Sequence, residues 1–254
     1  MHYLAKFDET MLKTPNSYRN HSKGYTENAL VDQTCGSVHT SMAICQLAPS
    51  GVLNSHYHTY EEGVYILQGE VLISIDEQAY HLKAGDWAVL PVGKPHAWHN
   101  VGAEFVQWLQ MAAPQPKLEG GLRHTFFLKS GDFPTEAQRL DPSNTQGNLL
   151  GHFGLDKIPS PNEEAYTAVS GRNGTFLNWL IDENMGAIHH RLLLVEFQPG
   201  VSIALHDHPF EECCFILSGE LECILDGERY VAKAEQTRFG RKSRLQIGCG
   251  QEHG

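Results

Sequence analysis

The stretch from His56 to Asn100, HYHTYEEGVYILQGEVLISIDEQAYHLKAGDWAVLPVGKPHAWHN, predicts a metal site carried on β-strands. His56 and His58 are two residues apart, so in an extended segment their side chains leave the backbone on the same face. Glu62 follows after a short bend, and His96 comes later, behind further turn residues. Three imidazoles and one carboxylate are a ligand set that suits Mn, Fe, Co, Ni or Zn. The sequence therefore predicts that the chain folds back to bring His96 to the other three side chains.

The same stretch and its flanks predict an all-β fold. Apolar residues alternate with polar ones in several short segments, and turn residues separate these segments. Upstream, the strand expected at Val38–Leu47 ends at a predicted turn, Pro49–Gly51, which directs the chain toward the first ligands. Short strands with turns at this spacing are typical of a sandwich or barrel. The other expected strands cover residues 64–66, 71–75, 80–82, 96–98 and 104–111, with turns at 68–69, 76–78, 85–86 and 91–93.

Composition and charge narrow the classes of partner. The chain has 254 residues and a formal net charge of −11, which argues against nucleic acid and anionic membranes, because phosphate binding relies on clustered Lys and Arg. No apolar run approaches the roughly 18 residues needed to span a bilayer. The first twenty residues lack an apolar signal core, so a soluble cytoplasmic protein with small-molecule partners is expected. Six cysteines without a CxxC pair predict buried free thiols.

The second half of the chain repeats the first at an offset of 150 residues. The shift pairs His56 with His206 and His58 with His208, and the following strand residues match without a gap as far as Lys233. Matches this dense at one offset indicate an internal tandem duplication. Residues 113–165 between the copies are rich in proline and glycine and predict a connection, with a short strand at His124–Leu128.

After Lys233 the repeat stops. The tail has no strand alternation and no equivalent of the strand at 104–111, so we expect an atypical ending, such as a truncated or frameshifted reading frame. At the opposite end, residues 1–35 are polar and contain many turn-forming residues. They predict an arm with at most a short strand.

Two motifs in the chain resemble those of the cupin superfamily, and the duplication makes the chain look like a bicupin. The first motif, G-x5-H-x-H-x3-E-x6-G, is matched in the second half by Gly200, His206, His208, Glu212 and Gly219, and in the first half by His56, His58, Glu62 and Gly69. In the first half its leading glycine is one residue late, with Ser50 in its place and Gly51 after it. The second motif, G-x5-P-x-G-x2-H-x3-N, is matched by Gly85, Pro91, Gly93, His96 and Asn100.

The resemblance implies two tandem cupin barrels of the double-stranded β-helix, or jelly-roll, type. Each intact barrel is expected to hold one divalent transition metal (Mn, Fe, Ni, Co or Zn) near its mouth. The expected organisation is an N-terminal arm (1–35), cupin domain 1 (36–112), the connection (113–165) and cupin domain 2 (166–254), whose end is atypical or truncated.

The first metal site, with His56, His58, Glu62 and His96, is the main expectation, and a second is formed by His206, His208 and Glu212. At the second site the fourth position is Gln246, which lies in the anomalous tail. The ureidoglycine aminohydrolase bicupins are similar in using Gln there, and three ligands plus water can also hold zinc.

Several further side chains have both a functional and a structural interpretation. Glu61 is a candidate general base or a solvated charge, and Lys94 is a candidate for binding a substrate carboxylate at the barrel mouth. His189–His190 either approaches the second pocket or forms a surface pair. Large aromatic residues (Tyr65, Trp98 and Trp108) either line the pocket or belong to the core, the core being the more common place for them.

Two classes of function remain open. The first is a metal-dependent enzyme acting on a small polar or carboxylate-bearing metabolite; a dioxygenase-type oxidoreductase is favoured because the ligand set leaves adjacent positions open for oxygen. Non-redox versions are an isomerase, a decarboxylase or a ureidoglycine-aminohydrolase-like enzyme. The second is a non-catalytic cupin that binds a metabolite or metal for sensing or storage. Fold-level resemblance does not choose among them. Sheet edges in such barrels tend to pair, so a homodimer is expected.

Overall fold

The computed structural model of the chain describes residues 3–117, 122–129, 133–134, 136–140, 149–168, 171, 174–204, 206 and 210–234. The chain forms two compact units. The first unit comprises Phe7–Gly154 together with Ile181–Arg191, and the second comprises Met1–Lys6, Leu155–Leu180 and Leu192–Gly254.

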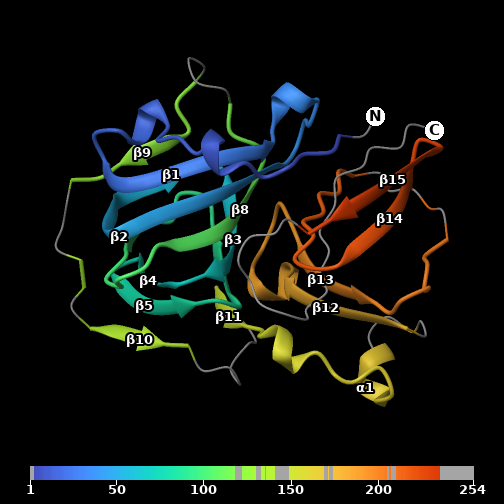
Figure 1. Cartoon of the computed structure of the whole chain (residues 1–254). Helices are drawn as coiled ribbons and strands as arrows, with labels where there is room; N and C mark the ends of the chain where they lie inside the picture. Colours follow the sequence, from blue (N-terminus) through green and yellow to red (C-terminus); the bar gives the residue numbers. More distant parts are fainter. Residues whose placement is uncertain are drawn as a thin grey trace. The chain divides into compact units, whose positions relative to one another are not determined.

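The first unit is a curled β-sheet with almost no helix (Figure 1). Its strands are β1 (Ser22–Val31), β2 (Ser41–His58), β3 (Glu61–Gln68), β4 (Glu70–Ile75), β5 (Gln78–Lys83), β6 (Asp86–Leu90), β7 (His96–His99), β8 (Val106–Ala113), β9 (Thr125–Phe127), β10 (Ala137–Arg139) and β11 (Leu150–His152). They form one eleven-stranded sheet in the order β10-β5-β4-β7-β2-β8-β3-β6-β11, with β1 and β9 also paired to β2. This arrangement confirms the all-β jelly-roll fold.

Strand β2 is the central element of this sheet. Its first part, Ser41–Leu47, pairs with β8, and its second part, from Val52 onward, pairs with β7. The predicted turn at Pro49–Gly51 does not separate two strands, because all three residues lie within β2. Ser50 instead has a φ of 57°, an irregularity of the kind that lets a strand bend where it changes partner.

The expectation that residues 1–35 hold at most a short strand is also wrong. Strand β1 has ten residues and pairs antiparallel with β2. Its glycine does not end the strand, since Gly24, at a φ of 73°, lies at a register shift between Lys23 and Tyr25. Beyond this shift Tyr25 points into the core and is 1% exposed.

The core fills the inside of the curled sheet with large aromatic and branched side chains. Trp98 and Trp108 stack at a ring separation of 4.8 Å, and Tyr25 lies 5.9 Å from Trp108. Both tryptophans belong to the buried hydrophobic cluster. Each large apolar side chain buried in this way contributes about 1.5–3 kcal/mol to stability.

The second unit repeats parts of the first. Its described strands are β12 (Thr175–Ile181, the last residue of which belongs to the first unit), β13 (Leu192–Phe197), β14 (Glu220–Leu225) and β15 (Glu228–Lys233), paired as β12-β13 and β14-β15. Hairpin β14-β15 lies 150 residues after hairpin β4-β5, with the same bounds at that offset, which confirms the duplication there. The tail from residue 235 lies outside the described residues.

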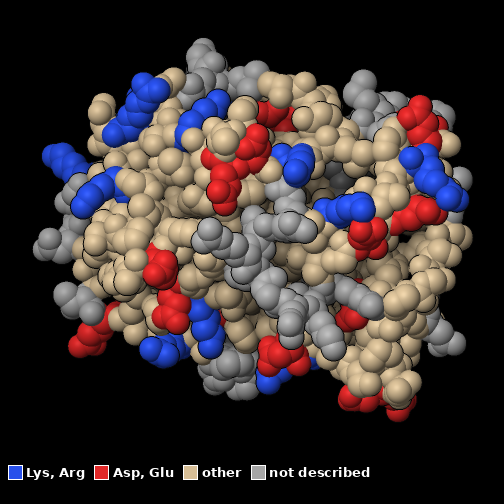
Figure 2. All heavy atoms as spheres, in the orientation of Figure 1, with Lys and Arg blue, Asp and Glu red and all other residues tan. Residues whose placement is uncertain are grey.

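Helices are few and short. They are the 3-10 helices η1 (Glu9–Met11), η2 (Asn16–Tyr18), η3 (Gln33–Cys35), η4 (Leu155–Lys157) and η5 (Glu183–Met185), and the α-helix α1 (Glu164–Thr167). None of the helices in the described part of the chain is long and apolar enough to cross a membrane. On the face in Figure 2, basic and acidic side chains are interspersed.

Candidate metal centre

The four predicted ligands of the first site lie together inside the curled sheet. His56 and His58 end β2, and His96 begins β7, where it is the register partner of His56. Glu62 is the second residue of β3. All four side chains are buried, and the ring nitrogens available in the three imidazoles lie within 4.8 Å of one another. The fold thus brings together residues up to 40 positions apart, and the cluster of His56, His58 and His96 could hold a metal ion.

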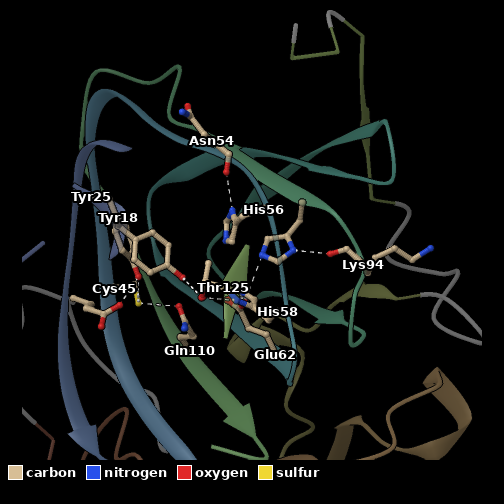
Figure 3. Close-up of polar contacts among 12 residues, drawn as sticks. Tyr18, Tyr25, Cys45, Asn54, His56, His58, Glu62, Lys94, Gln110 and Thr125 are labelled. Carbon is tan, nitrogen blue, oxygen red and sulfur yellow. Dashed lines mark hydrogen bonds and ion pairs between the residues drawn. The ribbon is translucent and has the colours of Figure 1, made fainter. Parts of the chain in front are cut away.

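Each of the three imidazoles is oriented by a contact at its Nδ1 atom, and Figure 3 shows these contacts for His56 and His58. A backbone carbonyl only accepts, so an imidazole bonded to one through Nδ1–H has its lone pair on Nε2, the atom that binds a metal. The contacts are His56 Nδ1 to the Asn54 carbonyl (2.7 Å), His96 Nδ1 to the Lys94 carbonyl (3.0 Å) and His58 Nδ1 to the Thr125 hydroxyl (3.0 Å).

Glu62 faces these imidazoles with an ionised carboxylate. Its Oε2 atom lies 3.0 Å from His58 Nε2 and 3.6 Å from His96 Nε2. Burial alone raises the pKa of Glu62, but the close contacts with His58 and His96 and their charges outweigh burial and hold the pKa well below its usual range. Burial, followed by the nearby His96 and His58, lowers the pKa of His56 well below its usual value. Ionised carboxylate and neutral imidazole are the forms that bind metals.

Two atoms of the cluster lack the hydrogen bonds that buried polar groups normally make. Glu62 Oε2 and His96 Nε2 are buried and have no hydrogen-bond partner among the described residues. Buried polar atoms without partners cost free energy, which a bound cation would recover. The donor set of three imidazole nitrogens and a carboxylate oxygen therefore fits a divalent transition metal.

Strand β9 covers the ligands and brings Thr125 to them. It pairs with the end of β2 so that Thr125 lies opposite His58 and Phe127 opposite His56. The short strand expected at 124–128 is confirmed, but its place beside the ligands was not predicted. No spacing in the sequence indicates a contact between residues 67 positions apart.

Aromatic rings complete the surroundings of the histidines. Tyr60 stacks on His58 at 4.3 Å and 11° between ring planes, and Tyr18 meets His56 edge-on at 5.8 Å. Tyr18 comes from η2, within the predicted arm, and its hydroxyl lies 3.5 Å from Thr125 Oγ1. These contacts restrict how the imidazoles can rotate.

Glu61 and His190, two of the ambiguous residues, lie next to each other in the first unit. Glu61 is buried and accepts hydrogen bonds from the backbone N–H groups of residues 188–190. Burial raises the pKa of Glu61, but the close His190 ring and the backbone hydrogen bonds outweigh it and lower the pKa to about 2. His190 does not form a surface pair with His189: its side chain packs on Glu61 and Gly63, whereas His189 is exposed. A catalytic role for Glu61 stays a prediction.

Lys94 lies near the ligands through its backbone only. Its carbonyl accepts from His96, while its ammonium lies 2.8 Å from Asp76 Oδ2. In Figure 3 the ammonium points away from His56 and His58. Its role toward a substrate carboxylate stays a prediction.

The second site is only partly described. His206 and Glu212 are exposed in the described part of the chain, and His206 Nδ1 lies 2.9 Å from the Ala204 carbonyl, as His56 does from Asn54. His208 and Gln246 lie outside the described residues. The second unit also has a pocket of about 550 Å³, formed by residues of β13 and β14 and their neighbours, and neither His206 nor Glu212 is among the described residues that line it.

A family model described as "Cupin domain" matches residues 43–111 and 193–239. Among curated proteins, "Polyketide synthase CurC" of Streptomyces cyaneus is 31% identical over 108 residues, which are 41% of this chain and 68% of the relative. "Protein SchB" of Streptomyces halstedii is 30% identical over 119 residues, covering 45% of this chain and 82% of the relative.

Two solved structures resemble nearly the whole chain in fold. A putative glyoxylate-induced protein from Pseudomonas aeruginosa aligns with 98% of this chain and 84% of its own, at a TM-score of 0.61 and 14% identity. A salicylate 1,2-dioxygenase from Pseudaminobacter salicylatoxidans aligns with 88% of this chain and 70% of its own, at a TM-score of 0.59 and 13% identity. At these identities the likeness concerns the fold.

Proposed function

Since this chain belongs to the cupin superfamily, we propose that it is a metal-dependent bicupin enzyme whose first unit binds one divalent transition metal through His56, His58, Glu62 and His96. The observation that carries the proposal is the orientation of the ligands. The Nδ1 contacts turn the histidines toward one another, and Glu62 Oε2 and His96 Nε2 are buried without hydrogen-bond partners in the described chain.

The metal would supply a Lewis acid with two of six coordination positions left for substrate, water or oxygen. The protein's own residues would prepare that site. The carbonyls of Asn54 and Lys94 hold their histidines in the tautomer that coordinates, and Thr125 contacts the third. Glu62 contributes negative charge, and burial of the cluster keeps bulk water away from it.

We propose a small polar or carboxylate-bearing metabolite as the substrate and dioxygenase-type oxidation with Fe or Mn as the reaction. The three-His, one-Glu set supports this reaction because adjacent open positions allow substrate and oxygen to meet. The fold it shares with a protein described as a salicylate 1,2-dioxygenase agrees with such a substrate, although a fold hosts many reactions.

A non-redox reaction is the second candidate, favoured by the curated relative described as a polyketide synthase. Polyketide synthesis forms carbon–carbon bonds rather than adding oxygen. Isomerisation, decarboxylation and ureidoglycine-aminohydrolase-like hydrolysis belong to the same non-redox class.

Oxygen uptake separates these candidates. The whole protein would be loaded in turn with Fe, Mn, Ni, Co and Zn, mixed with a panel of small carboxylic acids, and followed with an oxygen electrode and mass spectrometry. We expect oxygen uptake with one or more carboxylates. Product formation without uptake would support the non-redox candidate, and metal binding without any product would support the sensing or storage alternative.

A histidine variant links turnover to the site. We expect His56→Ala to abolish both turnover and stoichiometric metal binding, whereas His99→Ala, which changes a β7 histidine on the opposite face from His96, should retain both. Full turnover by His56→Ala would place the chemistry elsewhere.

We also propose that the protein is cytoplasmic and forms a homodimer through a sheet edge, since exposed strand edges tend to pair. Multi-angle light scattering tests the association state, and a monomer at micromolar concentration would contradict it.

A further inference from the structure

The backbone of residues 188–190 holds the Glu61 carboxylate at the start of β3. The two carboxylate oxygens accept hydrogen bonds from the N–H groups of Ile188 at 2.8 Å, His189 at 3.0 Å and His190 at 3.3 Å. The Glu61 side chain is only 1% exposed. Hydrogen bonds to an ionised, buried acceptor are stronger than those between neutral groups, so Glu61 is firmly fixed.

The His190 ring contacts Glu61 and Gly63, the two residues that flank Glu62 in the sequence. Its Nδ1 atom lies 2.8 Å from Glu61 Oε1. Its Nε2 atom lies against Gly63, where a Cβ would come within 2.3 Å of that nitrogen. Only glycine at position 63 leaves room for this ring, so one side chain contacts the residues immediately before and after a predicted metal ligand.

The segment that supplies these contacts is itself well ordered by local bonds. Asp182 caps η5 by accepting from the Asn184 N–H at 2.8 Å, and its carbonyl accepts from the Ala187 N–H at 3.2 Å. Gly186 ends η5 with a left-handed φ of 86°, a conformation that glycine adopts without strain. These bonds hold the chain in shape just before the N–H groups that bind Glu61.

We propose that Glu61 and His190 are positioning residues that fix the direction of the metal ligand Glu62. Successive residues of a strand point to opposite faces of the sheet, so Glu62 points to the histidines and Glu61 to the other face, where residues 188–190 cover it. Glu61 is also the first residue of β3, directly after a bend at residues 59–60. Glu62 pairs with Leu90 of β6 and Ala112 of β8, and the contacts of residues 188–190 with Glu61 add a further constraint at the start of β3.

This inference rests on the proposed metal centre and adds a dependence between the two copies of the repeat. At the offset of 150 residues, the segment at 181–191 corresponds to residues 31–41 of the first copy. His190 corresponds to Thr40, so the second copy supplies an imidazole that the first copy does not have at that position. A part of the second copy thereby completes the metal centre of the first.

Cobalt binding by the whole protein tests the inference without reference to any substrate. Co²⁺ would be titrated into the metal-free parent, His190→Ala, His190→Asn and His189→Ala, with the visible d–d absorption as the signal and thermal unfolding measured in parallel. We expect His190→Ala to weaken Co²⁺ binding about 10- to 100-fold, the usual effect of losing a group that orients a ligand. His190→Asn, whose amide can take the place of Nδ1, should recover most of the affinity, and His189→Ala should bind like the parent.

The outcomes separate this inference from the proposed function. If the parent binds Co²⁺ and His190→Ala binds it with the same affinity and spectrum, the positioning role is wrong, even if that variant melts at a lower temperature. If the parent binds no Co²⁺, the metal centre and this inference both fail. If the variants differ as expected but no substrate is turned over, the positioning role stands and the enzyme proposal falls.

Discussion

Thr125 and His58 are separated by 67 residues, yet the hydroxyl of one lies 3.0 Å from Nδ1 of the other. Removing that hydroxyl while keeping the side-chain shape should loosen one metal ligand. We expect Thr125→Val to weaken Co²⁺ binding about 10-fold or more, because groups that orient a metal-binding histidine typically contribute this much. Isothermal titration would measure the loss, with Thr26→Val on β1 as a matched control. Equal affinity in both variants would contradict a role for the hydroxyl.

Asn100 is the clearest structural residue of the second motif. Its amide donates to the carbonyls of Leu47 at 2.9 Å and Glu104 at 2.8 Å and accepts from the Gly102 N–H at 2.9 Å, and the residue is fully buried. We expect Asn100→Ala to lower the free energy of unfolding by roughly 2–4 kcal/mol, since each buried partner left unpaired costs about 1–3 kcal/mol. Urea unfolding followed by tryptophan fluorescence measures this. A loss below the error of extrapolation would contradict it.

The cluster of candidate ligands was predictable because the chemistry and spacing of its residues are local. His56, His58 and Glu62 fall within seven positions, and a strand geometry places the two histidines on one face. Thr125 and His190 were not predictable as neighbours of the site, because hydroxyls and imidazoles occur in many roles and only the folded chain brings these two to the ligands. The type of a residue indicates which contacts its side chain can make, and only the tertiary structure shows which groups it contacts.

At the scale of elements, the two copies of one hairpin turn differ in an informative way. Asp76 and Glu77 have φ values of 51° and 70°, and the equivalent Asp226 and Gly227 have 51° and 82°. Two successive positive φ values are typical of a two-residue hairpin turn, for which Asp-Gly is a preferred sequence. The first copy therefore carries a glutamate in a conformation that suits glycine.

Glu77→Gly should stabilise the first unit. A left-handed conformation costs an L-residue about 1–2 kcal/mol, and the greater chain entropy of unfolded glycine offsets part of that gain, so we expect a net increase of about 0.5–1 kcal/mol. Urea unfolding by tryptophan fluorescence measures it. Gln78→Gly, at the first residue of β5, should have the opposite sign because glycine weakens strands. A decrease for Glu77→Gly would show that the side chain has a stabilising contact.

Element boundaries were harder to predict than element type. Pro49–Gly51 was interpreted as a turn because proline and glycine also occur in turns, but here they lie where β2 leaves β8 and joins β7. The ten residues of β1 were underestimated because polar residues are frequent in a strand with an exposed face. In both cases the pairing between strands outweighs the local preference of the residues.

At the scale of the whole molecule, the tandem repeat was visible in the sequence because identical spacing survives at one offset. The sequence did not indicate that residues 181–191 of the second copy would belong to the first unit. Composition changes mark linkers, whereas this segment differs from its surroundings only in what it contacts.

Metal removal should affect the two units differently. A ligand at 100 times its dissociation constant stabilises the folded state by about 2.7 kcal/mol. Three of the four tryptophans, Trp87, Trp98 and Trp108, are buried in the first unit, so we expect chelation to lower the unfolding temperature that fluorescence reports. Fluorescence melts of the parent and of His56→Ala, with and without chelator, would measure it. An equal shift in His56→Ala would mean that the stabilising ion binds elsewhere.

The contact between Gly63 and His190 also limits how this gene can change. A side chain at position 63 meets the His190 ring at 2.3 Å, so Gly63→Ala is harmful while the histidine is present and tolerable once a smaller residue has replaced it. A side chain at position 63 therefore requires a change at position 190 as well. Through this one contact, a residue of the first copy and a residue of the second constrain each other's size.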